Sequence, residues 1–134
     1  MAKKQKAEVI VENKEFWPTK EDTNQFDIIF PLIKSDLEEI RKLSGKKQDE
    51  PLNPFKIKII NKKLEKAKFI LQNEPTIEFL DLLDEVTLPT NSDAVLQITQ
   101  FINAMNRFQN KYYVTIGGDD FDFNIGYSVW KTKD

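Results

Sequence analysis

The segment Lys111–Lys131, KYYVTIGGDDFDFNIGYSVWK, contains two alternating stretches separated by a glycine-rich turn. From 121 to 129, apolar side chains alternate with Asp, Asn, Gly and Ser, which is the period-2 pattern of a strand with one buried face. A shorter stretch of the same kind precedes it at 112–116. The GGDD sequence at 117–120 is typical of a tight turn, because glycine adopts positive φ and aspartate tolerates turn conformations. The segment therefore predicts a C-terminal β-hairpin whose core face is carried by the apolar residues of 121–129.

The residues before this hairpin predict several helices. An amphipathic pattern over 93–109, capped by Ser92 or Asn91, predicts the longest one, with an amide-rich polar face. A shorter helix is predicted over 35–43, beginning with a capping box at 35–38 and ending at Gly45. Another is predicted over 76–86, capped by Thr76, and Thr19 is expected to cap a short helix over 19–22.

Other stretches are rich in β-branched and aromatic residues and favour strands. These are 6–13, 26–32 with Pro31 near its end, and 55–60, where apolar residues alternate with lysines. The stretch 62–72 fits both helical and strand spacing. We favour a strand there, which makes 61–63 a hairpin turn.

Together these elements predict one α+β domain spanning 1–134. We expect a mostly antiparallel sheet with two or three helices packed on one face, ending in the long amphipathic helix and the hairpin. The chain of 134 residues suits one domain. Within it, we expect a basic N-terminal tail at 1–7 and an exposed, proline-marked loop at 46–54.

The composition excludes several classes of active site. The chain has no cysteine and no histidine, so thiolate nucleophiles, Ser-His-Asp triads and Cys/His zinc sites are impossible. Its four glycines form no phosphate-binding loop. We therefore expect no enzyme, cofactor or metal site. No apolar run reaches the ~20 residues of a membrane helix, and no secretory segment is evident, so we expect a location in the cytoplasm or within an intracellularly assembled particle.

One short motif points the other way. The residues Gly117–Phe121, GGDDF, resemble the GGDEF signature of diguanylate cyclases and the Gly-Asp-Asp turn of viral RNA polymerases. The resemblance implies carboxylates, here Asp119 and Asp120, that hold a divalent metal against nucleotide phosphates. It covers five residues and lacks the upstream acidic strand motif of the cyclases. We prefer the interpretation as turn residues and keep a metal-dependent nucleotide enzyme as a third hypothesis.

Charge is segregated along the chain despite a net charge of −2. Six lysines lie within 56–68: Lys56, Lys58, Lys62, Lys63, Lys66 and Lys68. On a strand they would form a ridge suited to a phosphate backbone, with aromatic residues nearby, although a pI of about 5.3 argues against a dedicated nucleic-acid binder. The following helix carries Glu78, Asp81, Asp84 and Glu85, which would form a solvated face, a patch for a basic partner, or the counterpart of the lysines in a neighbouring subunit.

Trp130 falls on the polar side of the last predicted strand, with Asp122 and Asn124. An outward tryptophan there is a candidate interface anchor. Our leading hypothesis is therefore a non-enzymatic protein-interaction or structural component of a larger complex, such as a phage, mobile-element or immunity-type accessory protein. A protein partner or a homo-oligomer is expected. The alternative is an accessory nucleic-acid-binding protein that uses the lysines of 56–68.

Overall fold

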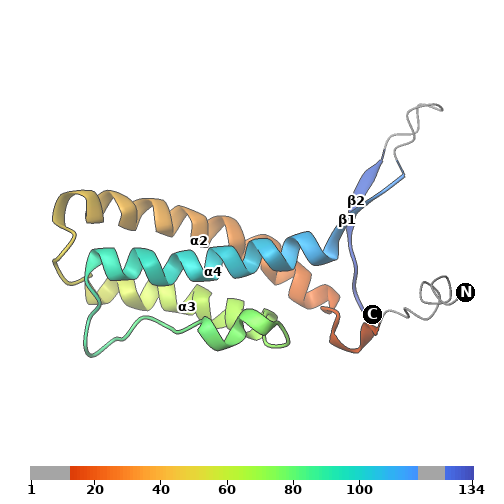
Figure 1. Cartoon of the computed structure of the whole chain (residues 1–134), viewed down its shortest axis with the longest axis horizontal. Coiled ribbons are helices and arrows are strands. Elements are labelled where there is room, and N and C mark those ends of the chain that lie inside the picture. Colours follow the sequence, from red (N-terminus) through yellow and green to blue (C-terminus); the bar gives the residue numbers. More distant parts are fainter. Residues whose placement is uncertain (1–12, 118–125) are drawn as a thin grey trace, which may run out of the picture.

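The structure is a computed structural model, which describes residues 13–117 and 126–134. Three α-helices lie side by side in an elongated bundle, and a short β-hairpin extends from one end of it (Figure 1). The expected mostly antiparallel sheet is wrong, because the described residues form only a two-stranded sheet. The elements are η1 (Lys14–Phe16), α2 (Lys20–Lys47), α3 (Pro54–Ile70), η2 (Pro75–Phe79), α4 (Asn91–Tyr112), β1 (Tyr113–Ile116) and β2 (Tyr127–Trp130).

Helix α2 replaces three predicted elements. Thr19 caps it as expected, through a capping box with Asp22, but the helix then continues through the predicted strand 26–32 and the predicted start at Ser35. It also passes Gly45. Most apolar residues of 26–40 recur at spacings of three and four, so a long helix buries Phe26, Ile29, Phe30, Ile33, Leu37 and Ile40 in the core and leaves Ile28 and Leu32 exposed. That burial offsets the ~3 kcal/mol cost of Pro31 inside a helix, where it lies on the exposed side.

Helix α3 replaces the predicted strand 55–60 and the predicted turn and strand after it. Asn53 caps the helix by accepting from the amides of Phe55 and Lys56, and Pro54 occupies its first turn, where no amide bond is lost. Its core residues are Ile57, Ile60, Leu64, Ala67 and Ile70. The alternation of apolar residues with lysines at 55–59 is therefore only the start of a helical pattern.

The predicted helix 76–86 is also wrong. Only the five residues of η2 are helical, and the chain then continues to residue 89 without a helix or strand, with a bend at 85–87. Leu80 and Leu83 are buried in the core. The backbone of Leu83 is bonded by the side chain of Asn61, and Asp84 accepts from the next amides, so these groups are satisfied without a helix.

Helix α4 confirms the predicted long helix. Its cap is Thr90, whose hydroxyl accepts from the Asp93 amide, rather than Ser92 or Asn91. The core face carries Ile98, Phe101, Met105 and Phe108 at helical spacing, among other apolar residues.

The C-terminal hairpin is confirmed, but the face of it that packs against the bundle is the opposite of the predicted one. Strand β1 pairs antiparallel with β2, and Tyr113 lies opposite Trp130. Tyr127 and Val129, expected to face the core, are exposed, whereas Trp130 packs against the core. Gly117 has a φ of 82°, as a turn glycine would. The predicted tail at 1–7, most of the strand at 6–13 and the residues 118–125 lie outside the described part.

Candidate interaction surfaces

The base of the hairpin is attached to the bundle through aromatic contacts. The ring of Trp130 lies 5.1 Å from that of Phe26 and 6.0 Å from that of Phe108, centroid to centroid. Its indole Nε1 donates to Asp27 of α2 at 3.3 Å. Trp130 is therefore not the outward anchor that the sequence suggested: it joins the hairpin to α2 and α4.

The C-terminal residues extend this attachment. The Lys133 amide donates to the Pro18 carbonyl at 2.9 Å, and the Asp134 carboxylate accepts from the Lys20 amide at 2.8 Å. Figure 1 shows this end of the chain beside the start of α2. Because both strands continue into anchored segments, the hairpin is held at its base and projects from the bundle as an arm. By "arm" we mean β1 and β2.

One face of the arm is apolar, and most of its described side chains are exposed. Directly opposite residues in a sheet share a face and successive residues alternate, so Val114, Ile116, Tyr127 and Val129 lie together. Ile116 is 45% exposed, Tyr127 62% and Val129 38%. The other face carries Tyr113 and Trp130 at the base and a Thr115–Ser128 hydroxyl contact of 3.3 Å farther out. Thr115 and Ser128 are exposed too, so both faces of the outer part of the arm meet solvent and the apolar side chains gather on one of them.

Helix α3 distributes the six lysines around its circumference rather than along one ridge. Lys63 pairs with Asp36 of α2 at 2.7 Å, and Lys56 and Lys68 are half-buried. Lys58, Lys62 and Lys66 follow one another at four-residue intervals on the exposed side. Three apolar residues lie among them, Phe55, Ile59 and Phe69, and the two phenylalanines are 70% and 64% exposed. We call these six exposed residues the basic stripe.

An acidic surface lies beside the basic stripe. It consists of Glu78, Asp81, Asp84 and Glu85, all exposed, together with Phe79 and Val86, the latter 90% exposed. We call these residues the acidic stripe. Its position is set by Asn61 of α3, which bonds the backbone of Leu83, and by the Leu52 amide, which donates to the Pro89 carbonyl at 2.8 Å. The segment therefore runs antiparallel to α3 along one flank.

Backbone amides of Thr87 and Val86 hold the pKa of the Asp84 carboxyl below its usual range. The acidic stripe therefore keeps this negative charge at neutral pH and well below it.

The other flank of the basic stripe, formed by α2, is also acidic. Glu21 and Asp22 lie across an open hollow of about 360 Å³ from Lys66 and Phe69. Asp36 and Glu39 lie across a second hollow, of about 170 Å³, from Lys56 and Ile59. The lysines of α3 are thus bordered by carboxylates on both sides.

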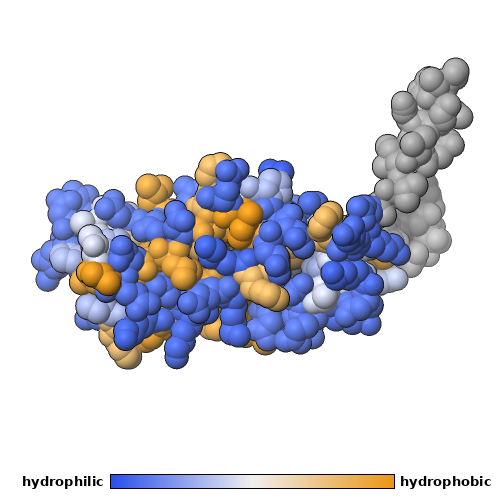
Figure 2. All heavy atoms as spheres, turned by 90° about the horizontal axis from the view of Figure 1, so that it is seen from below, coloured by the Kyte–Doolittle hydropathy of each residue, from blue (hydrophilic) through white to orange (hydrophobic). Residues whose placement is uncertain are grey.

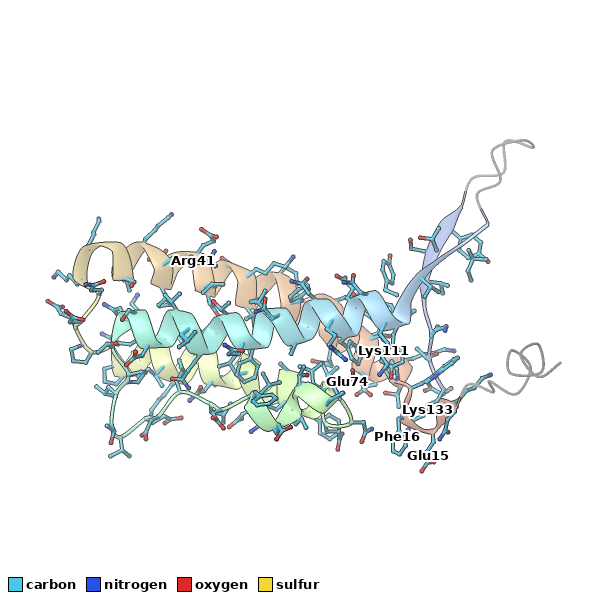
Figure 3. The ribbon with its side chains drawn as sticks, in the orientation of Figure 1. Glu15, Phe16, Arg41, Glu74, Lys111 and Lys133 are labelled. Atoms are coloured by element: carbon cyan, nitrogen blue, oxygen red, sulfur yellow. The ribbon has the colours of Figure 1, made fainter. Side chains whose placement is uncertain are left out.

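A buried carboxylate connects the loop after α3 with the end of α4. Glu74 accepts from the Tyr112 hydroxyl at 3.4 Å and lies 3.5 Å from the ammonium of Lys111 (Figure 3). The Glu74 side chain is 3% exposed and that of Lys111 50%. Both oxygens have partners on α4, so this pair ties the loop to the helix and leaves no free carboxylate for chemistry.

The metal-site hypothesis falls on residues that the structure largely does not describe. Asp119, Asp120, Asp122 and Asn124 lie outside 13–117 and 126–134, as do Gly118 and Phe121. Within those ranges, no group of three or more acidic residues is placed to hold a metal ion. The helices of the same ranges are all too short or too polar to cross a bilayer.

The sequence reasoning located the lysines and the acids but missed how they are arranged. The strand prediction for 55–60 also places Phe55 on the apolar face, whereas the structure leaves both Phe55 and Phe69 exposed. Their signal is present in the sequence: Phe55, Ile59 and Phe69 are the apolar residues of α3 that fall outside its core spacing. No protein-family model, curated protein or solved structure matches this chain.

Proposed function

We propose that this protein is a non-enzymatic interaction component that binds another protein through its arm. The observation that supports the proposal is the largely exposed apolar face of Val114, Ile116, Tyr127 and Val129. A two-stranded ribbon is marginally stable alone in water, and a contiguous exposed apolar surface is typical of a binding site. Tyrosine is also among the residues enriched in protein interfaces.

The attachment of the arm adds to this argument. Contacts of Trp130, Lys133 and Asp134 anchor the base of the arm. The arm is therefore partly ordered before binding, so less conformational entropy is lost when a partner binds. Each strand also has one unpaired edge among the described residues, to which a partner strand can add. A role in a phage, mobile-element or immunity-type assembly, in the cytoplasm or inside an intracellularly assembled particle, fits such a component.

Site-specific photo-crosslinking in extract of the native host tests the proposal. A benzoylphenylalanine replaces Val129 on the apolar face, and a matched control carries it at Glu38, an exposed position of α2. We expect the arm position to capture one defined polypeptide, identified by mass spectrometry, and the α2 position to capture none of it. Equal yields at both positions would contradict the proposal.

The captured partner, once purified, allows a second test by calorimetry. The variant Ile116→Thr with Tyr127→Thr removes an opposed apolar pair and keeps β propensity. We expect binding to weaken about tenfold or more, as for loss of interface anchors. The control Thr115→Ser with Ser128→Thr alters the opposite face and should bind as the parent does. Unchanged binding of the first variant would show that the partner uses another surface.

The nucleic-acid alternative is supported by the row formed by Lys58, Lys62 and Lys66 beside two aromatic rings. It is weakened by the carboxylates on both flanks, because a polyanion laid along α3 would approach them as well. The protein-binding proposal is therefore preferred. The metal-dependent nucleotide enzyme stays a prediction about Asp119 and Asp120.

A further inference from the structure

We propose that the basic stripe and the acidic stripe together form a self-complementary face on which a second copy of this chain docks. This face is separate from the arm, and the inference does not depend on what the arm binds. Figure 2 shows the side of the bundle seen from below Figure 1, with hydrophobic residues in the middle of the elongated surface among hydrophilic ones.

The charges of the two stripes are opposite, and the contacts of Asp84 with backbone amides and of Glu85 with Asn61 neutralise neither carboxylate. Among the residues that the structure describes, no ion pair joins Lys58, Lys62 or Lys66 to a carboxylate. The lysine of this helix that lies within reach of an acid, Lys63, is already paired with Asp36. Three lysines therefore face solvent beside four exposed acids on the neighbouring segment, and each set carries exposed apolar residues.

The side-by-side arrangement makes the face complementary to itself. A two-fold axis that runs between α3 and the segment, parallel to both, lays the basic stripe of each copy on the acidic stripe of the other. The same operation brings Phe55, Ile59 and Phe69 of one copy near Phe79 and Val86 of its mate. A closed dimer results, in which every contact occurs twice.

The length of α3 limits the strength of this dimer. Its 17 residues span about 25 Å at 1.5 Å per residue. A helix with its side chains is about 10 Å wide and a neighbouring segment adds about 5 Å, so the face covers roughly 400 Å² per copy, or about 800 Å² in total. This area is below the size of standard stable interfaces. We therefore expect a reversible dimer with a dissociation constant of roughly micromolar order, sensitive to salt.

A second copy fits this face better than a nucleic acid does. A phosphate backbone would pair with the lysines, but it would also meet the acidic stripe on one flank and Glu21 and Glu39 on the other. A second copy related by the two-fold axis instead sets its acidic stripe on the lysines and its basic stripe on the acids. An assay of oligonucleotide binding is therefore included in the experiment.

Sedimentation velocity of the full chain over a concentration series is the primary measurement. In about 50 mM salt we expect a monomer–dimer equilibrium that shifts several-fold toward monomer in about 500 mM salt. The basic-stripe variant, Lys62→Glu with Lys66→Glu, and the acidic-stripe variant, Glu78→Lys with Asp81→Lys and Glu85→Lys, should each be monomeric. A matched control, Lys34→Glu with Arg41→Glu, alters the α4 side of α2 and should dimerise as the parent does.

Mixing the two stripe variants is the decisive step. One variant carries two acidic stripes and the other carries two basic stripes, so each repels itself and complements the other. We expect an equimolar mixture to form a heterodimer at least as tight as the parent dimer, although neither variant dimerises alone. Circular dichroism of each variant checks that the helices are retained.

Three results would overturn the inference. A parent chain that stays monomeric at about ten times the expected micromolar constant in low salt has no such face. A dimer that survives both stripe variants uses another surface. Salt-dependent binding of a labelled single- or double-stranded oligonucleotide that is lost in the basic-stripe variant, with no dimer in the parent, would assign the lysines to nucleic acid instead.

Discussion

Replacing Asn61 by alanine tests the contact that holds the acidic stripe beside α3. Asn61 is 4% exposed, in the middle of α3. Its Oδ1 accepts from the Leu83 amide at 3.0 Å, and its Nδ2 donates to the Leu83 carbonyl at 2.9 Å. Leu83 is itself buried. The side chain thus satisfies both backbone groups of a residue 22 positions away.

The geometry gives the expected cost. The alanine variant leaves one buried N–H and one buried C=O without a partner, and each such group costs about 1–3 kcal/mol. We expect the free energy of unfolding to fall by about 3 kcal/mol in total. With a urea m-value of about 2 kcal/mol/M, the unfolding midpoint should drop by about 1.5 M. Amide hydrogen exchange at Leu83 should accelerate in the same variant.

Two further variants separate this account from a general effect on α3. Asn61→Asp keeps the acceptor for the Leu83 amide but sets a second oxygen against the Leu83 carbonyl, so it should cost at least as much as alanine. Asn106→Ala removes an exposed asparagine of α4 and should change the free energy by less than about 0.5 kcal/mol. A midpoint for Asn61→Ala within about 0.3 M of that for Asn106→Ala would refute the reasoning.

Three other predictions follow from single positions. Trp130→Ala should lower the free energy of unfolding, measured by urea titration, by about 2–4 kcal/mol and should weaken the near-ultraviolet circular dichroism signal, because the contacts of Trp130 with Phe26 and Phe108 attach the arm. A stability equal to that of the parent would contradict that attachment. Gly45→Ala should raise the melting temperature by a few degrees, since a Cβ there meets nothing within 4 Å and alanine favours helix by about 0.5–1 kcal/mol; a lower melting temperature would show that the glycine is needed. The carboxyl pKa of Asp84, measured by carbon-detected NMR, should be lower than that of the same residue in an unfolded peptide. Its stabilising contribution is therefore present above the unfolded pKa and is lost as the pH falls through the folded pKa. Equal pKa values in the two states would count against the two amide hydrogen bonds.

The long helix α4 and the hairpin could be predicted because their patterns fit one period only. Over 93–109 the apolar residues recur at three and four positions, and over 121–129 of the sequence they alternate. The strands predicted at 26–32 and 55–60 were wrong because short apolar runs satisfy both periods. Residues 26–30, FDIIF, place apolar side chains at spacings that either element can bury.

Of the candidate sites, the residue types were predictable and their arrangement was not. The lysines of 56–68 and the acids of 78–85 are visible as charge runs. The lysines form a ridge on a strand but are spread around a helix, and the strand predicted for this stretch is a helix in the structure. The prediction of which hairpin face packs on the bundle was wrong for another reason. Alternation shows that the two faces of a strand differ, but it does not show which one meets the bundle.

The sequence alone determined the absence of histidine and cysteine chemistry, the long helix around 93–109, the hairpin after it and the segregation of charge. These are properties of composition and of local periodicity. Only the tertiary structure decided that α2 continues through Pro31, that Asn61 holds Leu83 out of a helix, and that Trp130 turns inward while Tyr127 and Val129 stay exposed. The physical reason is that each of these outcomes depends on what another part of the chain buries or bonds, and a local pattern contains no information about that partner.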